Sequence, residues 1–416
     1  MKVLYIGGVG PFGGASRSLY EAVGALPPGS VEPVFLMPRG TALDFYRRVA
    51  SDTLAIRGVS RFDHTRAAHY RGVRWIVVLR ELSNLPSMLL GLRRARRRWP
   101  DIDLIHVNEF TEIIPGLLAK RLFGVPLVVH VRSLVHTDAK MRRTRWLHKA
   151  LAQADAIVAI DETVRGSLPA ELNVNVIHNS FTSNPTEKPD DRYLAQFDRL
   201  RPNALKVGFV GNLLRTKGIV ELVRAARMVK DRGGDVQYII IGGGIASERS
   251  ITSEVARRLG LAQTAEEEVR RLIADLGLEQ EVFLFGPTAD IQRTYSKMDV
   301  LAFPSHLDSP GRPVFEAGFF GVPSIVAVRH PLPDTIIDKK TGIAIAEPHP
   351  VLIADAILEF ERDRSEVRRM GDAARALAER NYLPELNATK LLQLYWRILE
   401  RRSSGDSPPQ FYGEHT

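Results

Sequence analysis

Short runs of apolar residues rich in Val and Ile recur along the whole chain, and longer amphipathic segments separate them. Because parallel strands must be joined by a crossover connection, usually a helix, this alternation predicts βαβ units in parallel sheets covered on both faces. In the first half, the runs predict strands at 2–8, 33–37, 103–108, 127–132, 156–161 and 174–179. The second half repeats the rhythm, with strands predicted at 206–211, 236–241, 282–285, 300–304, 324–328 and 342–346.

A polar stretch divides the two halves. Residues 182–204 contain three prolines and no strand periodicity, which is typical of a linker. The predicted fold class is therefore α/β, with two Rossmann-like doubly wound parallel-sheet domains at residues 1–185 and 200–382. Apolar residues at helical spacing predict a closing helix at about 383–402, assigned to the first domain, and the polar residues 403–416 are expected to be a disordered tail. Since doubly wound sheets bind ligands beyond the carboxyl ends of their strands, two in tandem predict a ligand in the cleft between them.

The composition of the chain bears on the compartment in which the protein is expected. The chain has no cysteine, so disulfides and thiolate metal sites are excluded, and its first apolar run meets glycines too early for a signal peptide. No uninterrupted apolar run reaches the ~20 residues that a membrane-spanning helix needs. We expect a cytoplasmic protein, with peripheral binding to the inner membrane face as an open alternative.

The net charge of +9 is concentrated in the first half, where residues 1–180 carry 25 Lys and Arg against 15 Asp and Glu. The densest runs are 92–100 and 140–150, where arginines are mixed with Trp99 and Trp146. Two interpretations stay open: solvated helix faces, or a site for an anionic membrane surface or an anionic lipid-linked acceptor. Nucleic acid is not expected as a partner, because no base-stacking strand or recognition motif accompanies the charge.

The segment 300–326 carries the most informative chemistry. A predicted strand ends at Pro304, a loop follows, and Pro313 fits the first turn of a helix that stops at Gly321. This spacing places Glu316 in the first turn of the helix and Asp308 in the loop. Taken alone, the two carboxylates have equally good structural explanations: Glu316 as a charge that favours the helix dipole, and Asp308 as a polar loop residue.

The loop DSPGRPVFEA (308–317) resembles the signature of the retaining GT-B glycosyltransferases of family four, where an acidic residue and a glutamate flank a loop such as EPFGRPVIEA. The resemblance implies that Glu316 binds both ribose hydroxyls of a nucleotide-sugar donor and that two helix-start amides bind its diphosphate. Asp308 stands where the family usually has Glu, and would stabilise the cationic ring carbon of the transition state. The expected substrate-binding residues of this loop are Ser309, Gly311, Arg312, Val314 and Glu316.

A second motif, VGFVGNLLRTKGIVELVRAA (207–226), predicts a strand, a glycine turn and a helix that begins near Gly218. It resembles the family's GRL…KG element, which binds the donor diphosphate through an Arg and a Lys. Lys217 and Gly218 match, whereas Asn212 replaces the usual Arg, and we expect Arg215 to supply the guanidinium instead. Ordinary surface cations are the alternative explanation.

Two further segments follow the family pattern. VFLFGPT (282–288) falls where relatives hold the nucleobase, which implies backbone contacts at Gly286 and Thr288. The glycine-rich turn at 7–23 resembles the family's GGxER loop, whose glycines let helix amides point at the donor phosphate. Its matching positions are Gly13, Gly14 and Arg17.

The strand LVVHVRSLV (127–135) lies where many relatives place a His that contacts the transferred sugar. Arg132 occupies that position, and His130 lies two residues earlier on the same strand face. Arg132 is expected to hold a negatively charged donor or acceptor, with a structural salt bridge as the alternative. His106, near the end of the strand before, is a candidate substrate ligand or a satisfied core histidine.

The resemblance covers nearly residues 1–400, and it implies a retaining, metal-independent transfer from a UDP- or GDP-sugar to a glycan or lipid-linked acceptor. No cofactor is expected beyond the nucleotide-sugar donor. Asp101 and Asp103 form an Asp-Ile-Asp like the metal motif of the other glycosyltransferase fold, but they precede a strand, so no metal site is predicted. Catalytic roles are expected for Asp308, Arg215, Lys217 and Arg132.

Other functions remain open at this point. An epimerase-like or hydrolase-like enzyme, or a non-catalytic protein that binds sugar nucleotides, would share the same architecture. A basic nucleic-acid binder is a third alternative, which the salt dependence of binding would reveal.

Overall fold

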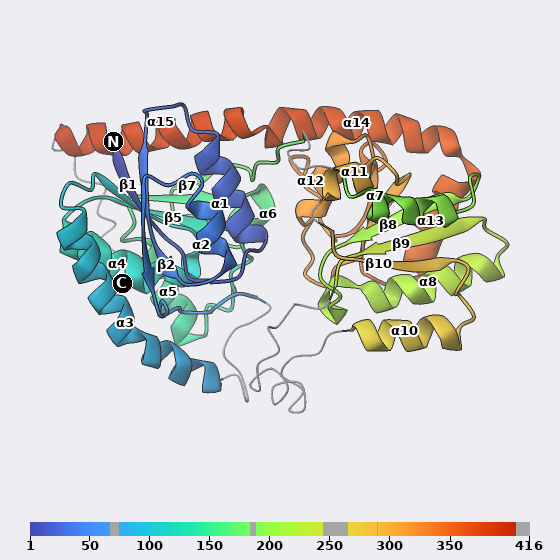
Figure 1. Cartoon of the computed structure of the whole chain (residues 1–416), viewed down its shortest axis with the longest axis horizontal. Helices are drawn as coiled ribbons and strands as arrows, with labels where there is room; N and C mark the ends of the chain where they lie inside the picture. The colour runs from blue at the N-terminus through green and yellow to red at the C-terminus, as the bar shows by residue number, and fades with distance from the viewer. Residues whose placement is uncertain (67–74, 184–188, 244–264, 289, 405–416) are drawn as a thin grey trace, which may run out of the picture. The chain divides into compact units, whose positions relative to one another are not determined.

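The computed structural model describes residues 1–66, 75–183, 189–243, 265–288 and 290–404 (Figure 1). The chain forms two compact units: unit 1 comprises Met1–Phe181 and Tyr382–Thr416, and unit 2 comprises Thr182–Asn381. The tail expected to be disordered, 403–416, lies outside the described residues from 405 onward.

Unit 1 is built on a seven-stranded sheet in which all neighbouring strands are parallel, in the order β3-β2-β1-β4-β5-β6-β7. Its strands are β1 (Lys2–Ile6), β2 (Glu32–Pro38), β3 (Asp52–Ile56), β4 (Leu104–Val107), β5 (Leu127–Val131), β6 (Ala156–Ala159) and β7 (Val174–Val176). All six strands predicted for the first half are present. The prediction missed β3, a short edge strand whose residues are mostly half-buried and therefore lack a strong apolar signature. The strand order changes direction between β1 and β4, which is the switch point where doubly wound sheets bind ligands.

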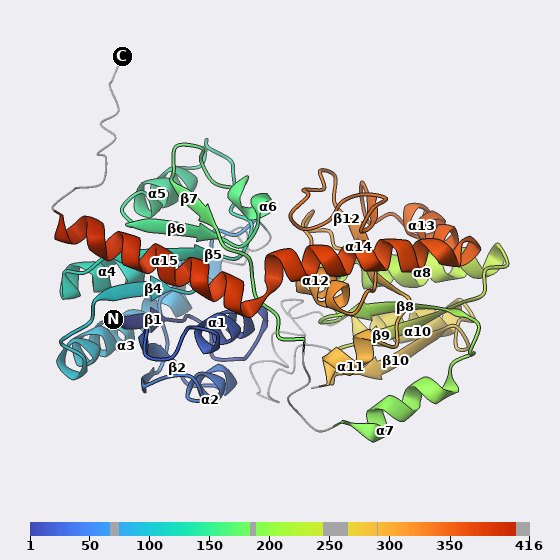
Figure 2. The same cartoon turned by 90° about the horizontal axis from the view of Figure 1, so that it is seen from above.

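The helices of unit 1 cover both faces of this sheet. They are α1 (Gly14–Gly24), α2 (Thr41–Tyr46), α3 (Ile76–Arg98), η2 (Phe110–Glu112), α4 (Ile113–Phe123), α5 (Arg142–Leu151), α6 (Glu162–Arg165) and α15 (Pro384–Ser403). Successive residues of β1 point to opposite faces, so Leu4 and Ile6 pack with α3, α4 and α5, whereas Val3 and Tyr5 pack with α1 and α15. The predicted closing helix is thus real, and α15 runs across the strands of unit 1 (Figure 2).

Unit 2 repeats the architecture with six parallel strands in the order β10-β9-β8-β11-β12-β13. The strands are β8 (Leu205–Val210), β9 (Val236–Ile241), β10 (Val282–Gly286), β11 (Val300–Phe303), β12 (Ser324–Ala327) and β13 (Gly342–Ile345). Every strand predicted for the second half is present. The switch point lies between β8 and β11, the two strands that lead into the predicted donor-binding motifs.

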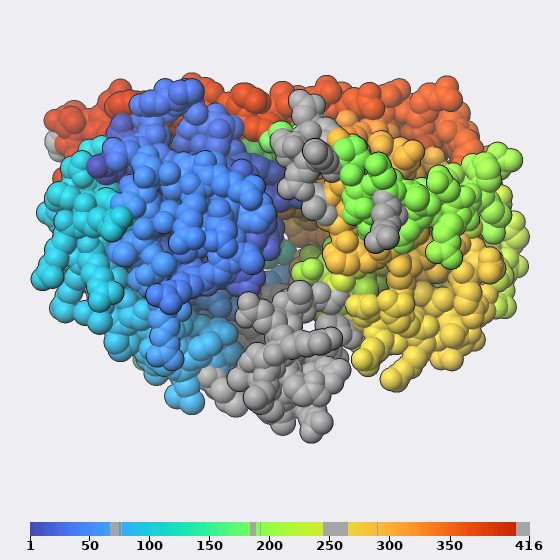
Figure 3. All heavy atoms as spheres, viewed as in Figure 1, coloured from blue at the N-terminus to red at the C-terminus, as the bar shows by residue number. Residues whose placement is uncertain are grey.

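The helical elements of unit 2 are α7 (Asp191–Leu194), η3 (Ala195–Arg199), η4 (Arg215–Lys217), α8 (Ile219–Asp231), α10 (Glu266–Asp275), α11 (Ile291–Tyr295), α12 (Arg312–Phe319), α13 (Pro350–Arg362) and α14 (Arg364–Tyr382). One face of the sheet packs against α8, α10 and α13, and the other packs against α11 and α12. The surface of α10 is visible in yellow in Figure 3.

The stretch predicted as a linker is partly folded. Its described residues 189–204 include α7 and η3, whose Tyr193 and Phe197 are buried on the face of the sheet that packs with α11 and α12, against Phe285 of β10. The sequence pattern did not predict these short elements. Their two buried aromatic residues are isolated among prolines and charged residues, so they produce no helical periodicity. Within the described part of the chain, no helix is long and apolar enough to cross a membrane.

Candidate functional site

The turn between β8 and α8 is fastened to the end of β11. Gly218 has a φ of +75°, and a Cβ added there would lie 1.8 Å from the carbonyl oxygen of Pro304. Only glycine combines this left-handed conformation with such a close backbone approach. The backbone N–H of His306 also donates to the carbonyl of Thr216 at 3.0 Å. The two segments singled out in the sequence therefore form one cluster at the switch point of unit 2.

Lys217 is the cation at the centre of this cluster. Its side chain is half-buried, and its ammonium nitrogen lies 5.2 Å from the ring centre of Phe303, the last residue of β11. Burial lowers the pKa of Lys217. Among the described residues, no carboxylate lies within the 4.0 Å of an ion pair with this ammonium group. A partly desolvated cation of this kind is suited to an anionic ligand.

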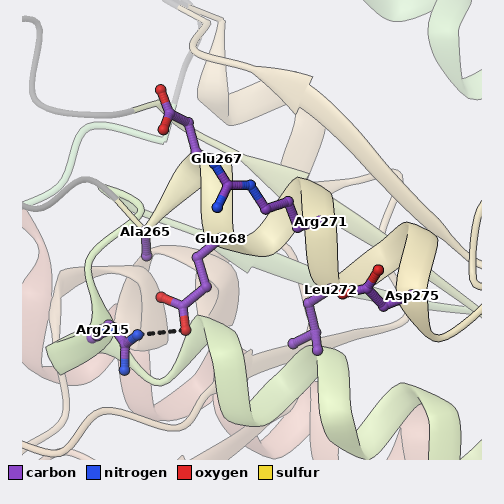
Figure 4. Close-up of a pocket in the computed structure, with 7 residues that line it drawn as sticks. All are labelled: Arg215, Ala265, Glu267, Glu268, Arg271, Leu272 and Asp275. Atoms are coloured by element: carbon purple, nitrogen blue, oxygen red, sulfur yellow. Dashed lines mark ion pairs between the residues drawn. The ribbon is translucent and has the colours of Figure 1, made fainter.

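Arg215 lies two residues earlier in η4 and points towards α10 (Figure 4). Its Nη2 is 2.6 Å from Oε1 of Glu268, although most of the Arg215 side chain is exposed. The two residues line a cavity of about 450 Å³, together with Ala265, Glu267, Arg271, Leu272 and Asp275. Arg215 thus carries a carboxylate partner that the sequence pattern did not indicate, and an anionic ligand at Arg215 would compete with Glu268.

Glu316 is buried, with 4% of its surface exposed, and both of its carboxylate oxygens already accept hydrogen bonds. Tyr295 Oη donates to Oε2 at 2.8 Å, and Arg312 Nε donates to Oε1 at 2.9 Å. Because each oxygen carries two lone pairs, both keep room for one further donor such as a ribose hydroxyl. The predicted place of Glu316 in the first helical turn is wrong, since α12 begins at Arg312 and its first turn holds no acidic residue. Tyr295 lies outside every motif and was not signalled by the sequence.

Asp308 adopts a φ of +54°, which is uncommon for a residue other than glycine. Its Oδ1 accepts a hydrogen bond from the backbone N–H of Arg329 at 2.9 Å, and Nε of Arg329 lies 4.0 Å from Oδ2. The loop after β11 is therefore tied to the loop after β12 through this carboxylate. Nearby, the predicted phosphate-binding amide of Val314 donates to the carbonyl of Gly311 at 3.0 Å, and Ser309 Oγ donates to the carbonyl of Pro310.

The remaining predicted donor residues of unit 2 lie on the neighbouring strand ends. Asn212 is exposed, two residues after the end of β8. The carbonyl of Gly286 accepts from the backbone N–H of Gly242 at 3.0 Å and from Tyr193 Oη at 3.2 Å, so its two acceptor positions are used within unit 2. Thr288 Oγ1 accepts from the N–H of Asp290 at 3.0 Å.

In unit 1, the glycine-rich turn precedes an exposed helix start. Gly13 is the N-cap of α1, no side chain caps the helix there, and a Cβ on Gly13 would have nothing within 4 Å. Amides at such a helix start favour an anion. Arg17 is turned back along the helix, with Nε donating to Glu21 Oε1 at 3.0 Å and the guanidinium 5.5 Å from the ring centre of Phe181.

Arg132 is held by polar groups from two segments beyond the carboxyl end of β5, the residues that follow β4 and the residues that follow β7. Its Nε donates to Oδ1 of Asn108 at 2.9 Å, and its Nη1 donates to Oδ1 of Asn179 at 2.6 Å. Its backbone N–H donates to Glu109 Oε1 at 3.1 Å. The sequence identified Arg132 but did not predict its contact with Asn179. Asn179 lies 47 residues later, and only the folded chain brings the two side chains together.

His106 and His130 are buried in a chain of polar contacts on adjacent strands. His106 Nε2 lies 3.2 Å from His130 Nδ1, and His106 Nδ1 is within hydrogen-bond distance of Tyr395 Oη. Burial lowers the pKa of His106 to about 3 and also lowers the pKa of His130 well below its ordinary value, so both rings are neutral. The surroundings of His106 therefore fit the interpretation as a core histidine whose hydrogen bonds are satisfied. Its ring could act on a substrate only through the residues that it contacts.

Two carboxyls follow β4, that of Glu109, which is half-buried, and that of Glu112, which is buried. Burial raises the pKa of Glu109 to about 7, and burial together with the charge of Glu109 raises the pKa of Glu112 to about 8. Glu112 Oε2 is buried without a hydrogen-bond partner among the described residues. A neutral carboxyl avoids the cost of a buried charge, which explains why these two groups hold their protons near neutral pH.

No group of three or more His, Cys, Asp or Glu side chains among the described residues is placed to hold a metal ion. Asp101 and Asp103 precede β4, as expected, and both bond to Lys2: the carboxylate of Asp101 accepts from Nζ and that of Asp103 from the backbone N–H, each at 2.7 Å. They lie at the end of the strand opposite to the polar clusters described above.

Comparison with known proteins places this geometry in a family. The model of Glycosyltransferase Family 4 matches residues 12–181, and that of Glycosyl transferases group 1 matches residues 194–377. The D-inositol 3-phosphate glycosyltransferase of Actinosynnema mirum is 27% identical over 358 residues, which cover 77% of this chain and 79% of the relative. The 2-deoxystreptamine glucosyltransferase of Streptomyces kanamyceticus is 26% identical over 71% of this chain and 75% of its own length.

Among solved structures, Anabaena HepE in complex with UDP superposes with a TM-score of 0.71 at 19% identity, covering 95% of this chain and all of HepE. The same protein has been solved with UDP-glucose. Both the sheet order of each unit and the end-to-end match agree with the GT-B architecture expected from the sequence. The chain therefore belongs to the family four, group 1 glycosyltransferases, and it is a glycosyltransferase with two Rossmann-like parallel-sheet units.

Proposed function

We propose that this glycosyltransferase takes its sugar from a UDP-sugar, with a GDP-sugar as the alternative donor, and transfers it with retention and without a metal ion. The observation that carries the proposal is Lys217, a half-buried cation over Phe303 that has no carboxylate partner among the described residues. HepE has been solved with UDP and with UDP-glucose, and these ligands favour uridine over guanosine. Retention and metal independence rest on the resemblance of the loop 308–317 to the family signature.

In this proposal, unit 2 is the donor domain. Lys217 and Arg215 neutralise the leaving diphosphate, which preorganised cations and amide dipoles stabilise more strongly than water does. Glu316 accepts hydrogen bonds from the ribose hydroxyls through the lone pairs that Tyr295 and Arg312 leave available. Asp308 is the carboxylate assigned to the developing positive charge on the sugar ring.

Unit 1 is the acceptor domain, and a glycan or lipid-linked acceptor is the proposed substrate class. Arg132 is its candidate anchor for an anionic group, because its guanidinium is fixed by neutral amide oxygens of Asn108 and Asn179. The name of the Actinosynnema mirum relative adds an inositol phosphate to the acceptors to be tried.

A ligand screen tests the donor assignment. A donor at 100 times its dissociation constant stabilises the folded protein by ~2.7 kcal/mol, so UDP-, GDP- and ADP-sugars should separate in a thermal-shift series. We expect the UDP-sugar to give the largest shift, and Lys217→Ala to abolish it. Equal shifts with all three nucleotides, or none, would contradict the proposal. Rapid release or epimerisation of the sugar without an acceptor would favour the epimerase-like alternative.

We also propose that unit 1 binds an anionic membrane surface at the inner face of the cytoplasmic membrane. The exposed side of α3 carries Leu79, Leu82 and Leu90, with 67%, 53% and 52% of their surfaces exposed. The guanidinium of Arg143 on α5 lies 5.0 Å from the ring centre of Trp75, so the leucines continue into a basic, aromatic edge. Exposed leucines beside Trp and Arg are typical of interfacial helices that attract anionic lipids.

Flotation with vesicles tests this membrane proposal. We expect the protein to float with vesicles rich in phosphatidylglycerol, but not with pure phosphatidylcholine, and Leu79→Glu with Leu82→Glu to prevent flotation. Trp396→Glu is the matched control, because Trp396 is 46% exposed on α15, which packs on the opposite face of the sheet from α3 (Figure 1). Failure of the wild-type protein to float at low salt would contradict membrane binding and leave the donor assignment untouched.

A further inference from the structure

A buried row of hydroxyl and imidazole groups connects α15 to Arg132. Tyr5 Oη lies 3.3 Å from Tyr395 Oη, and Tyr395 Oη is within hydrogen-bond distance of His106 Nδ1. His106 Nε2 lies 3.2 Å from His130 Nδ1, which in turn lies 3.3 Å from Arg132 Nη2. The two tyrosines and the two histidines of this row are at most 4% exposed, so their contacts are shielded from bulk solvent.

The direction of every proton in this row follows from Arg132. A guanidinium nitrogen can only donate, so His130 Nδ1 must be a bare acceptor. His106 Nε2, which faces the same bare nitrogen, must then carry a proton, because two lone pairs in contact would repel. A neutral imidazole carries one N–H, and His106 Nδ1 is therefore an acceptor.

Tyr395 and Tyr5 form the other end of the row. Tyr395 has a single hydroxyl proton and must donate it to His106 Nδ1, so its oxygen accepts from Tyr5. His130 is left with its proton on Nε2, and this buried N–H has no partner among the described residues. Protonation of either ring is opposed by burial and by the charge of Arg132, which lower both pKa values.

We propose that Tyr395 is a positioning residue for Arg132, acting through His106 and His130, because its hydroxyl proton and the Arg132 guanidinium together fix the two tautomers. Without that proton, His106 can place its own proton on Nδ1 and turn a bare Nε2 towards His130. His130 Nδ1 then has to carry a proton to meet it, and this proton opposes the N–H of Arg132. The expected effect on catalysis rests on the proposed role of Arg132 in substrate binding. The expected tautomers of His106 and His130 do not depend on that role.

Nuclear magnetic resonance of histidine-labelled protein tests the row directly. In the wild-type protein at pH 7, we expect Nε2 of both His106 and His130 to be protonated and both Nδ1 atoms to have the shift of an unprotonated nitrogen. His106→Gln and His130→Gln assign the signals. A protonated Nδ1 on either ring in the wild-type protein would overturn the proposal without any activity measurement.

Tyr395→Phe then tests the effect on Arg132 and on catalysis. We expect mixed tautomers at His106, a broadened Nη signal of Arg132, and a kcat about tenfold lower, which corresponds to the loss of one hydrogen bond in the transition state. The KM for the donor should change less than about twofold, since the donor site is assigned to unit 2. Tyr46→Phe is the matched control, because Tyr46 Oη is equally buried in unit 1 but bonds to the carbonyl of Ser16.

The outcomes separate the two proposals. If Tyr395→Phe shows mixed histidine tautomers but an unchanged kcat, the positioning role of Tyr395 is overturned. If Tyr395→Phe keeps the wild-type tautomers, the proposal that the hydroxyl proton of Tyr395 helps to fix them is overturned. If the wild-type protein shows no transfer with any acceptor, the proposed function fails while the resonance signals still decide the row. Should Tyr395→Phe not fold, the wild-type tautomers remain decisive.

Discussion

The ammonium group of Lys217 lies over the ring of Phe303, 5.2 Å from its centre. The residue that ends β11 therefore stabilises the cation that precedes α8, and it does so from the neighbouring strand of the switch point. An aromatic face supports a positive charge without neutralising it. The cation keeps its attraction for a diphosphate.

Replacing Lys217 tests this attraction. We expect Lys217→Ala to lower kcat by ~10²-fold or more, the scale of removing one preorganised donor to the transition state. Lys297→Ala, at an exposed lysine of unit 2, is the control and should retain wild-type kinetics. Wild-type turnover of Lys217→Ala, measured with a UDP-sugar, would remove the phosphate role.

The hydroxyl of Tyr295 holds Glu316 in place, so Tyr295→Phe should loosen the ribose contact. We expect the KM for the donor to rise about fivefold and the free energy of unfolding to fall by about 1 kcal/mol, the usual net value of one hydrogen bond. Tyr238→Phe is the matched control in the same unit, because its buried hydroxyl has no partner within the described structure. An unchanged KM in Tyr295→Phe would indicate that Glu316 does not bind the donor.

Glu268 competes with a ligand for Arg215. Glu268→Gln should therefore tighten donor binding about two- to fivefold, in line with the small value of an exposed ion pair. Titration calorimetry with UDP at low and high salt measures the effect, which should shrink as salt screens the charges. The neighbouring Glu267→Gln serves as the control. Weaker binding in Glu268→Gln would show instead that the carboxylate holds Arg215 in its binding position.

The carboxyls of Glu109 and Glu112 predict a fall in the free energy of unfolding between about pH 4.5 and pH 8. An unfolded glutamate titrates near 4.5, whereas burial raises the pKa of Glu112 in the fold to about 8, so the folded state retains a proton that the unfolded state has lost. Stability from this group is complete below pH 4.5 and is lost as pH rises through 8. The lowered pKa of His106 acts in the opposite sense, but its contribution is constant above pH 6.5.

Between pH 6.5 and 8, the carboxyl groups should therefore act alone. We expect the free energy of unfolding to fall by roughly 1–2 kcal/mol over this range, and Glu112→Gln to flatten the fall. Denaturant titrations at several pH values measure it, and Glu171→Gln, at an exposed glutamate of unit 1, is the control. A stability that rises from pH 6.5 to 8 would contradict the buried, protonated state of Glu112.

The strand pattern predicted the fold well because a strand that is covered on both faces must be apolar along its length. Every strand except β3 therefore appears in the sequence as a short apolar run. The motif at 308–317 likewise led to Glu316, since a strand end, a loop and Pro313 constrain the chain locally. Local spacing still misplaced Glu316 by part of a turn, because α12 begins at Arg312, one residue before the proline.

The partners of the candidate residues could not be predicted in the same way. Glu268 meets Arg215 across 53 residues of chain, and Asn179 meets Arg132 across 47. Nothing in the sequence next to Arg215 or Arg132 records which side chain the fold brings there. The row from Tyr5 to Arg132 is the extreme case, since its first contact joins residues separated by 390 positions.

The packing of α15 on unit 1 has a consequence for the order in which the protein is made. Leu391 and Tyr395 complete the cluster that contains Val3 and Tyr5, so this side of the sheet lacks the part of its cover that α15 supplies until residues 384–403 have left the ribosome. By then every residue of unit 2 has been synthesised. The usual sequence, in which the N-terminal domain matures first, is thus reversed, and the nascent first sheet presents an apolar face that chaperones can hold.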